Sequence, residues 1–511
     1  MQVNVTQENF LEVLPKIEEA IFDSDFIAFD FEFLGLDEAG ISLFDSPAQR
    51  YEILRRSVTK YAPCQLGLSL YSQTSDETYE ADVYTIPLFQ QLGGPRNFSI
   101  HKDALNFLRF NNFDFQNVFK NGVQYCTRKQ LDNYSFDFSE FESLDCEIIE
   151  NSAYSTSFEI DFPEKLNHLE KLLITSKLSR KYPDLSFLIQ GDVLLAEERK
   201  KREEDIFETS ILGVTKIIET IVDSKTLIVG HNCFADLMYI FQYFFDDLPE
   251  SYELYKSILH SKLPYIFDTK HFAKTSKISN ILSDNGILDN NFECLSNFFQ
   301  SPASHQLTPH TLRNNSEISG NFHDAGFDSY QCGQLFIKLS HILIGDTENI
   351  IDFPRMFEMI KDVAMNRIPM SLTDVEYCDL TKREDKRGNR PDIIQIRKRS
   401  GEKISEAEKL EVASKLNWQL KNYRTSLRIG KSGKVLEIAT NTPTTYAFVC
   451  DKYSKNPNWI LCDELDGNSL TYEQRLTSAT KMKEAYANLR NIDFQIARIE
   501  NILTNKAAWR K

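Results

Sequence analysis

The stretch FIAFDFEF, residues Phe26–Phe33, decides the fold of this chain. Its aromatic and aliphatic residues are typical of a buried strand, and the apolar spacing from Glu8 to Ile21 predicts a helix before it. Residues two apart on a strand share a face, so Asp30 and Glu32 project side by side. Two such carboxylates raise each other's pKa and cost folding energy unless a cation neutralises them, and their hard oxygens suit Mg²⁺ or Mn²⁺. Taken alone, the pattern also fits an edge strand that shows both acids to water.

A second acidic position follows another predicted strand. The residues TLIVG, Thr226–Gly230, read as a buried strand that ends in Gly-His-Asn and leads into a helix carrying Asp236. Asn232 is expected to cap this helix. Apolar neighbours such as Phe234 and Leu237 predict a largely buried helix, in which a carboxylate needs a partner.

The segment HDAGFDSYQCGQLF supplies the third element, with His323 and Asp328 five residues apart. Five is not a same-face spacing on a helix. We therefore expect His323 in the loop that leads into a helix and Asp328 in its first turn, where both can face one cleft. A histidine considered by itself is more often a hydrogen-bonded surface residue than a catalytic one.

Length and patterning predict more than one domain. A chain of 511 residues exceeds what one hydrophobic core organises. We expect an α/β domain with a mixed sheet flanked by helices over residues 1–126 and 206–345, interrupted by a connector at 127–205. A smaller α+β domain over 346–470 and a C-terminal helix over 471–511 follow, the helix from apolar residues recurring every three or four positions.

Charge and cysteine usage bound the class of protein. The net charge of −17 counts against a protein that binds nucleic acid over its whole surface. It does not exclude a nuclease, because a metal-binding active site concentrates carboxylates. The best candidate RNA-contact strip is 382–403, with nine Lys or Arg against four Asp or Glu, and an ordinary exposed loop explains it equally well. The nine cysteines show no paired C-x-x-C spacing. Without a signal peptide or a long apolar run, we expect a soluble intracellular protein, cytoplasmic or nuclear, with no membrane partner.

Together the three acidic motifs resemble the histidine-containing branch of the DEDD exonuclease superfamily, whose domain is RNase H-like. Flanking stretches narrow the resemblance to the poly(A)-specific ribonuclease family: FDSPAQRYEILRRS at Phe44–Ser57, FDFQNVFKNGVQY at Phe113–Tyr125 and FDTK at Phe267–Lys270. The resemblance covers roughly the first 345 residues apart from the connector. It implies a 3′→5′ exoribonuclease that releases nucleoside 5′-monophosphates from a free 3′-hydroxyl end.

The resemblance also implies roles for single residues. Asp30, Glu32, Asp236 and Asp328 match the ligands of two metal ions, Mg²⁺ or Mn²⁺, and His323 matches the general base that activates the attacking water. Lys270 matches a position that contacts the substrate. Three further side chains could pack against terminal bases, with core packing an equal alternative, and these are Leu36, Phe113 and Phe115.

Departures from the family bear on the substrate. RKYPD at Arg180–Asp184 lacks the histidine of the R-x-x-x-H signature, so we expect no inserted single-strand-binding domain. That leaves two RNA substrates open, poly(A) tails for a deadenylase and 3′ extensions of small RNAs such as PIWI-interacting RNA precursors for a trimmer.

The C-terminal part and the partners are less determined by the resemblance. TTYAFVCD at Thr444–Asp451 resembles the aromatic strand of an RNA-recognition fold, so 346–470 reads as a degenerate module of that kind. The family implies a homodimer, and a recruiting protein stays open. The alternatives are a catalytically inactive RNA-binding scaffold of the same fold and a DNA exonuclease; the first requires a lost ligand, and the flanking matches disfavour the second.

Overall fold

A computed structural model describes the chain over residues 1–37, 40–75, 78–91, 97–132, 206–287, 291–304, 306–308, 318–346, 349–370, 373–386, 392–419, 425–440 and 443–462, with strands and a few further positions between 146 and 198. The chain forms two compact units. The first comprises Met1–Glu38, Tyr51–Pro369 and Tyr377–Glu384, and the second comprises Ala39–Arg50, Met370–Glu376 and Asp385–Lys511.

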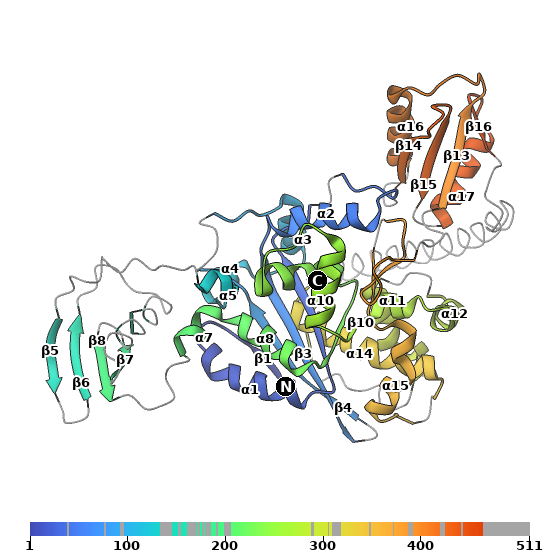
Figure 1. Ribbon diagram of the computed structural model, residues 1–511. Coiled ribbons are helices and arrows are strands. Elements are labelled where there is room, and N and C mark those ends of the chain that lie inside the picture. The colour runs from blue at the N-terminus through green and yellow to red at the C-terminus, as the bar shows by residue number, and fades with distance from the viewer. Residues whose placement is uncertain are drawn as a thin grey trace, which may run out of the picture. The chain divides into compact units, whose positions relative to one another are not determined.

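A six-stranded mixed sheet lies at the centre of the first unit, in the order β1-β4-β3-β2-β9-β10 (Figure 1). Its strands are β1 (Gln2–Asn4), β2 (Phe26–Phe33), β3 (Pro63–Ser75), β4 (Thr78–Pro87), β9 (Leu227–Gly230) and β10 (Ile266–Asp268). β2 pairs antiparallel with β3 and parallel with β9, and β9 pairs parallel with β10. The carboxyl ends of β2, β9 and β10 therefore lie at one edge of the sheet, where ligands bind in open α/β folds.

Helices cover both faces of this sheet, as predicted. Those described in the first unit, with α2 shared between the units, are α1 (Phe10–Asp23), α2 (Pro47–Val58), α3 (Lys102–Phe110), α4 (Phe115–Asn121), α5 (Arg128–Asp132), α7 (Ile206–Leu212), α8 (Val214–Ser224), α9 (Phe234–Ile240), α10 (Tyr252–Lys262), α11 (Thr269–Ala273), α12 (Ser276–Asp284), α13 (Phe292–Gln300), α14 (Ala325–Ile344) and α15 (Phe353–Ala364). A π-helical turn, η3 (Phe241–Phe245), continues α9, and a 3₁₀ turn, η4 (Pro302–Ser304), follows α13. The long helix α14 is buried along nearly its whole length and contacts β2, β3 and β4.

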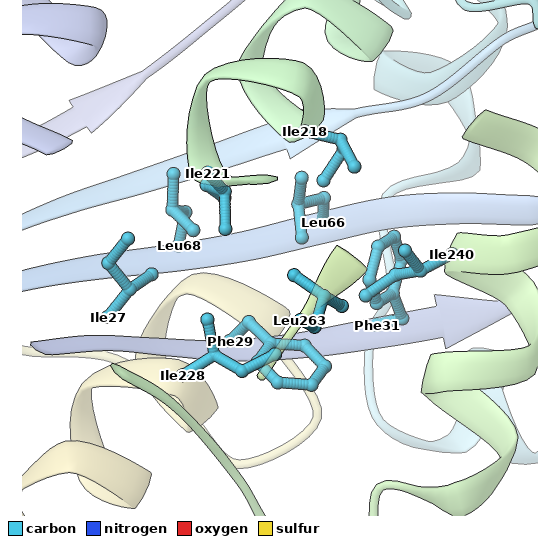
Figure 2. A pocket seen from close by; sticks show the side chains of 10 residues that line it. All are labelled: Ile27, Phe29, Phe31, Leu66, Leu68, Ile218, Ile221, Ile228, Ile240 and Leu263. Carbon is cyan, nitrogen blue, oxygen red and sulfur yellow. The ribbon is translucent and has the colours of Figure 1, made fainter. Parts of the chain in front are cut away.

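The alternation along β2 separates a dry face from an acidic one. Ile27, Phe29 and Phe31 point to the face covered by α8, where they line a small cavity of about 20 Å³ (Figure 2). Its other walls are also apolar and come from Leu66, Leu68, Ile218, Ile221, Ile228, Ile240 and Leu263. Without polar partners such a gap holds no ordered water, so it is a packing feature. The opposite face of β2, with Phe26 and Ala28, packs in the same core as α14.

The first unit continues beyond the predicted boundary at residue 345. The buried residues Phe353, Met356, Ile360 and Ala364 of α15 belong to the same core as α14, because helix α15 presents one apolar face to it. A short antiparallel pair, β11 (Arg367–Pro369) and β12 (Tyr377–Asp379), completes this unit.

The predicted connector contains a separate sheet. Its strands β5 (Cys146–Asn151), β6 (Ser155–Ile160), β7 (Leu185–Gln190) and β8 (Val193–Glu198) form four antiparallel neighbours in the order β5-β6-β8-β7. The Arg180–Asp184 stretch lies outside the described residues. The absence of a single-strand-binding domain stays a prediction.

The second unit is built as β-α-β-β-α-β. Strands β13 (Asp392–Lys398), β14 (Thr425–Ile429), β15 (Val435–Thr440) and β16 (Trp459–Leu461) form an antiparallel sheet in the order β14-β15-β13-β16, with helices α16 (Glu406–Gln419) and α17 (Pro443–Ser454). This order is that of the ferredoxin-like fold. The expectation that TTYAFVCD forms an aromatic strand is wrong: it lies in α17, whose Tyr446, Val449 and Tyr453 are buried in the core of this unit.

Two sequence predictions concern the end of the chain and its relation to membranes. The helix expected over 471–511 lies outside the described residues. Among the residues that are described, no helix is both long and apolar enough to cross a bilayer.

Candidate active site

Three elements bring the four predicted acids to one edge of the sheet. Asp30 and Glu32 lie on β2, on the face that packs toward α14. Asp236 is in the first turn of α9, directly after β9, which pairs in parallel with β2. Asp328 is in the first turn of α14. Burial and then the charges of Asp328 and Asp236 raise the pKa values of Asp30 and Glu32, in keeping with this common position.

Glycine at one strand position allows α14 to begin this close to the sheet. Gly67 on β3 pairs with Asp30, and a Cβ atom there would lie 1.7 Å from the carbonyl oxygen of Ala325. The neighbouring strand residue Gln65 pairs with Glu32, and its Oε1 accepts a hydrogen bond from the Ala325 backbone N–H at 2.9 Å. The start of α14 thus rests directly on the strand beside the acids.

The loop before α14 places the histidine as predicted. His323 precedes the N-cap Asp324 and takes a left-handed conformation with φ of 69°. Its backbone N–H donates to Oδ2 of Asp328 at 2.9 Å. One possible ligand atom each from Glu32, His323 and Asp328 lies within 4.8 Å of the others. Oδ1 of Asp328 is buried and accepts no hydrogen bond from the described residues.

The electrostatics of the cluster are those of carboxylates without enough counter-charge. Burial, followed by the charges of Asp328, Asp236, Glu32 and Asp324, raises the pKa of Asp30 well above its usual value. Burial and neighbouring acids likewise raise the pKa of Glu32. Burial raises the pKa of Asp236 to about 7, against hydrogen bonds from the backbone that include Phe31. Burial also raises the pKa of Asp328 to about 7, opposed by its hydrogen bond from His323.

This donor set fits divalent metal ions. Buried, closely spaced carboxylates are costly unless cations neutralise them. The oxygen-rich set suits Mg²⁺ or Mn²⁺ rather than a soft metal, and the orphaned Oδ1 of Asp328 is a lone-pair site that a metal would occupy. Four carboxylates can hold two ions, which is the arrangement that two-metal phosphoryl chemistry uses.

The imidazole of His323 is suited to accept a proton. Burial lowers its pKa, and the nearby Glu293 carboxylate opposes this shift. The ring is therefore neutral near pH 7, as a general base must be. The imidazole ring of His323 and the phenyl ring of Phe107 on α3 form a T-shaped pair, with ring centroids 4.6 Å apart.

A second layer of polar groups supports the edge of the sheet. Asp268, at the end of β10, is fully buried, and its carboxylate accepts hydrogen bonds from the backbone N–H groups of Cys233, Lys270 and His271 at 2.8, 2.9 and 3.1 Å. It thereby joins the loop before α9 to the start of α11. Nδ1 of the half-buried His231 lies 2.9 Å from the hydroxyl of Thr269.

The predicted substrate-contact residues lie in different surroundings, and only some of them lie near the acids. Lys270 is half-buried in α11, and its charge lowers the pKa of His231 after the larger effect of burial, so it lies near the same edge of the sheet. Leu36 is half-buried after β2. Phe113 and Phe115 pack against one another, with ring centroids 5.0 Å apart, on a small buried cluster that includes Leu34 and Leu108. Their surroundings agree with the core-packing alternative, and a role in base contact stays a prediction.

Sequence reasoning missed two residues and misplaced one cap. Phe107 is 48% exposed and touches His323, although nothing in its local pattern marks it. Asp324 is the N-cap of α14 and adds negative charge to the cluster; an Asp just before a helix was a readable signal. Asn232 does not cap α9. The N-cap is Cys233, without a side-chain cap, because Asn232 turns through a left-handed conformation with φ of 57°.

Comparisons with known proteins found a family match and several similar ribonucleases. The profile of a family described as "CAF1 family ribonuclease" matches residues 5–336. The 3′-5′ exoribonuclease parn-1 of Caenorhabditis elegans is 34% identical, with 94% of this chain and 95% of the relative covered. The pre-piRNA 3′-exonuclease trimmer of Bombyx mori is 26% identical, over 77% of this chain and 82% of its own length. The poly(A)-specific ribonuclease PARN of Xenopus laevis is 24% identical, over 74% and 69%.

Proposed function

The chain belongs to the CAF1 family of ribonucleases and is a 3′→5′ exoribonuclease, and we propose that it shortens single-stranded RNA at an active site with His323 as general base. The metal ligands of this proposed site are Asp30, Glu32, Asp236 and Asp328. The observation that supports the assignment is that one possible ligand atom each from Glu32, His323 and Asp328 lies within 4.8 Å of the others, at the carboxyl edge of three parallel strands. Asp30 on β2 and Asp236 directly after β9 lie at the same edge. All five residue types that the resemblance implies for an active enzyme are present in the sequence. The inactive-scaffold alternative therefore has no support in the site.

The four carboxylates would hold two divalent metal ions, Mg²⁺ or Mn²⁺, which when bound stabilise charge on the attacking and leaving oxygens at phosphorus. The chain's own groups do the rest. The neutral imidazole of His323 takes the proton of the attacking water. The backbone N–H of His323 holds Asp328 in place at 2.9 Å, so the base and a metal ligand are fixed to one another. In this proposal the positive charge of Lys270 holds a phosphate group of the RNA.

The proposed substrates are RNAs with a free 3′-hydroxyl end, either poly(A) tails or 3′ extensions of small RNAs. The support comes from the names of two relatives, a pre-piRNA 3′-exonuclease and a poly(A)-specific ribonuclease. Leu36 and the exposed ring of Phe107 next to His323 are the surfaces we propose for the terminal bases, since apolar and aromatic side chains hold bases without reading them closely. A homodimer and a recruiting protein are part of the same proposal.

The purified chain, Mg²⁺ and two labelled RNAs test this function. One RNA carries a 3′ oligo(A) tail and the other a 3′ extension of mixed sequence, each also prepared with a blocked 3′ end. Shortening of the tail alone indicates a deadenylase, and equal shortening of both indicates a small-RNA trimmer. The Asp30→Ala variant is the control. Persistence of shortening in that variant, or cleavage of the blocked RNAs, would contradict the proposed site.

A further inference from the structure

His231 is a polar residue at the carboxyl edge of the sheet that the proposed chemistry does not use. It directly follows β9 and precedes Asp236 by five residues. Thr269, the first residue of α11, holds it there. The hydroxyl oxygen of Thr269 lies 2.9 Å from Nδ1 of His231 and 3.1 Å from the carbonyl oxygen of Gly230. The imidazole of His231 is therefore tied to the ends of both β9 and β10.

A short chain of contacts joins His231 to the acids. The hydroxyl oxygen of Thr269 lies 3.8 Å from Sγ of Cys332, on the helix whose first turn carries Asp328. Burial is the main reason why the pKa of the Cys332 thiol is raised, and the charges of Asp30 and Asp328 add to this effect. His231 and the acids thus share neighbours at the same edge of the sheet.

Aromatic rings connect His231 to the proposed general base as well. The ring centroids of His231 and Phe292 lie 4.9 Å apart, and those of Phe292 and Phe322 lie 6.0 Å apart. Phe322 directly precedes His323 in the chain. All of these side chains are half-buried, so each keeps part of its surface exposed. His231 therefore lies at one end of a row of rings that leads to His323.

The hydrogen bonds of Thr269 determine which nitrogen of His231 carries the proton. A hydroxyl has one hydrogen, and Thr269 donates it to the Gly230 carbonyl oxygen. The hydroxyl oxygen therefore accepts from Nδ1 of His231. Burial, followed by the charges of Lys270 and Lys274, lowers the pKa of His231 well below its usual value, so the ring is neutral at pH 7. Nε2 keeps a lone pair, and it accepts no hydrogen bond within the described part of the chain.

The positive charges beside this acceptor match the backbone of a nucleic acid. Lys270 follows Thr269 in α11, and Lys274 is the C-cap of that helix. Cations attract phosphate groups, so the part of an RNA expected beside His231 is its sugar–phosphate backbone. Inside that backbone the phosphates only accept hydrogen bonds, and the 2′-hydroxyl is the group that can donate one. A neutral imidazole nitrogen with a lone pair is the matching acceptor.

We propose that His231 is an RNA-contacting residue whose Nε2 accepts a hydrogen bond from a ribose 2′-hydroxyl near the 3′ end. The contact makes the enzyme prefer RNA over a strand without 2′-hydroxyls. The proposed metal ligands and general base do not supply this preference, because they act on the phosphate and on the attacking water. The inference rests on the proposed function, since it takes the RNA 3′ end to be bound at the acids.

Two substitutions of His231 in the full chain separate a substrate contact from a structural role. In His231→Asn the side-chain amide can replace Nδ1 toward Thr269, but no atom replaces Nε2. In His231→Gln the amide reaches the place of Nε2 and the contact with Thr269 is lost. Removal of the first nucleotide is measured on single-stranded RNAs that carry one 2′-fluoro group, placed near the 3′ end one position at a time or far upstream as the control. Fluorine removes the hydrogen-bond donor and keeps the sugar pucker of RNA.

The expected result is a preference that depends on both the 2′-hydroxyl and Nε2. In the parent, fluorine at one position near the 3′ end should lower kcat/KM by about three- to tenfold, the range for one hydrogen bond. His231→Asn should lose a similar factor on unmodified RNA and show no further loss with fluorine at that position, because the contact is lost once. His231→Gln should keep part of the preference. Variants that lose activity equally on hydroxyl and fluoro RNA would overturn the proposal and assign His231 a structural role through Thr269.

Failure of this inference can be told apart from failure of the proposed function. A parent that shortens every RNA at the same rate overturns the inference alone. A parent that shortens no RNA contradicts the proposed function, and the affinities of the parent and His231→Asn for the labelled hydroxyl and fluoro RNAs then decide the inference. Weaker binding of the fluoro RNA by the parent, but not by His231→Asn, supports the contact. Equal or undetectable binding of the two RNAs by the parent overturns it.

Discussion

Substituting Gly67 by alanine tests how the active site is assembled. A Cβ atom at this strand position would lie 1.7 Å from the carbonyl oxygen and 2.0 Å from the carbonyl carbon of Ala325, and 2.6 Å from the backbone nitrogen of Gly326. All three are backbone atoms at the start of α14, so no side chain can rotate away. Ordinary contact begins near 3.4 Å, and α14 would have to retreat by roughly 1.7 Å.

That displacement is large compared with what the chemistry tolerates. Metal–ligand distances vary by only about 0.2 Å, and a misplacement of about 1 Å in a catalytic group costs on the order of 10²-fold in rate. Asp328 sits in the first turn of α14 and His323 just before it, so both would move away from Glu32 together. We expect kcat/KM for RNA to fall by at least about 10²-fold and stability to fall by about 1–3 kcal/mol from overpacking.

The assay combines RNA shortening, calorimetric titration with Mn²⁺ and thermal denaturation. Gly430→Ala is the control, because a Cβ there meets other atoms at 3.5 Å or more and should leave all three readouts unchanged. A Gly67→Ala protein that binds Mn²⁺ and shortens RNA like the parent would refute the reasoning that the close seat of α14 on β3 sets the geometry of the site.

Two further predictions concern the electrostatics and the ring beside the base. In the folded chain the pKa values of Asp236 and Asp328 are raised to about 7, above the value of unfolded aspartate. Between about pH 4 and 7 the metal-free folded chain therefore binds more protons than the unfolded chain. The free energy of unfolding of the metal-free chain falls as the pH rises through that window. The increase in melting temperature caused by Mg²⁺ should therefore be larger at pH 8 than at pH 5.5, and smaller at pH 8 in Asp328→Asn; a Mg²⁺ effect independent of pH in the parent would contradict this. Phe107→Ala should lower kcat/KM by about tenfold, because one stacking contact with a base beside His323 is worth about 1–3 kcal/mol. Phe110→Ala is the control, since Phe110 lies on the same helix and is 79% exposed. Equal activities of the two variants would show that Phe107 has no such role.

The sequence predicted the parts of the site that depend on local periodicity. The two-residue repeat of β2 separates Asp30 and Glu32 from the apolar Ile27, Phe29 and Phe31, and the structure shows that separation, with α14 on one face and α8 on the other. The first-turn position of Asp236 was likewise readable from a strand followed by a helix. Such features follow from backbone geometry over a few residues, which the sequence carries directly.

The local sequence pattern gave a wrong prediction at two places, the cap of α9 and the segment TTYAFVCD. Asn232 has the composition of a cap but turns through a left-handed conformation, and Cys233 begins the helix. TTYAFVCD has the alternation and aromatic content of a strand, yet it is helix α17, because Tyr446, Val449 and Tyr453 fill the core of the second unit at helical spacing. Short apolar runs are ambiguous between strand and helix until their packing partner is known.

The sequence by itself determined the family, the exonuclease fold and the chemical type of the site, because acids at strand and helix-start spacings and their flanking motifs are contiguous in the chain. Only the tertiary structure decided that Phe107 touches His323, that Gly67 opens the space in which α14 begins, and that Phe44 is held by Arg428. These contacts join residues that lie from about 220 to about 380 positions apart in the chain. Their geometry is set by packing between elements. Local propensity does not encode that packing.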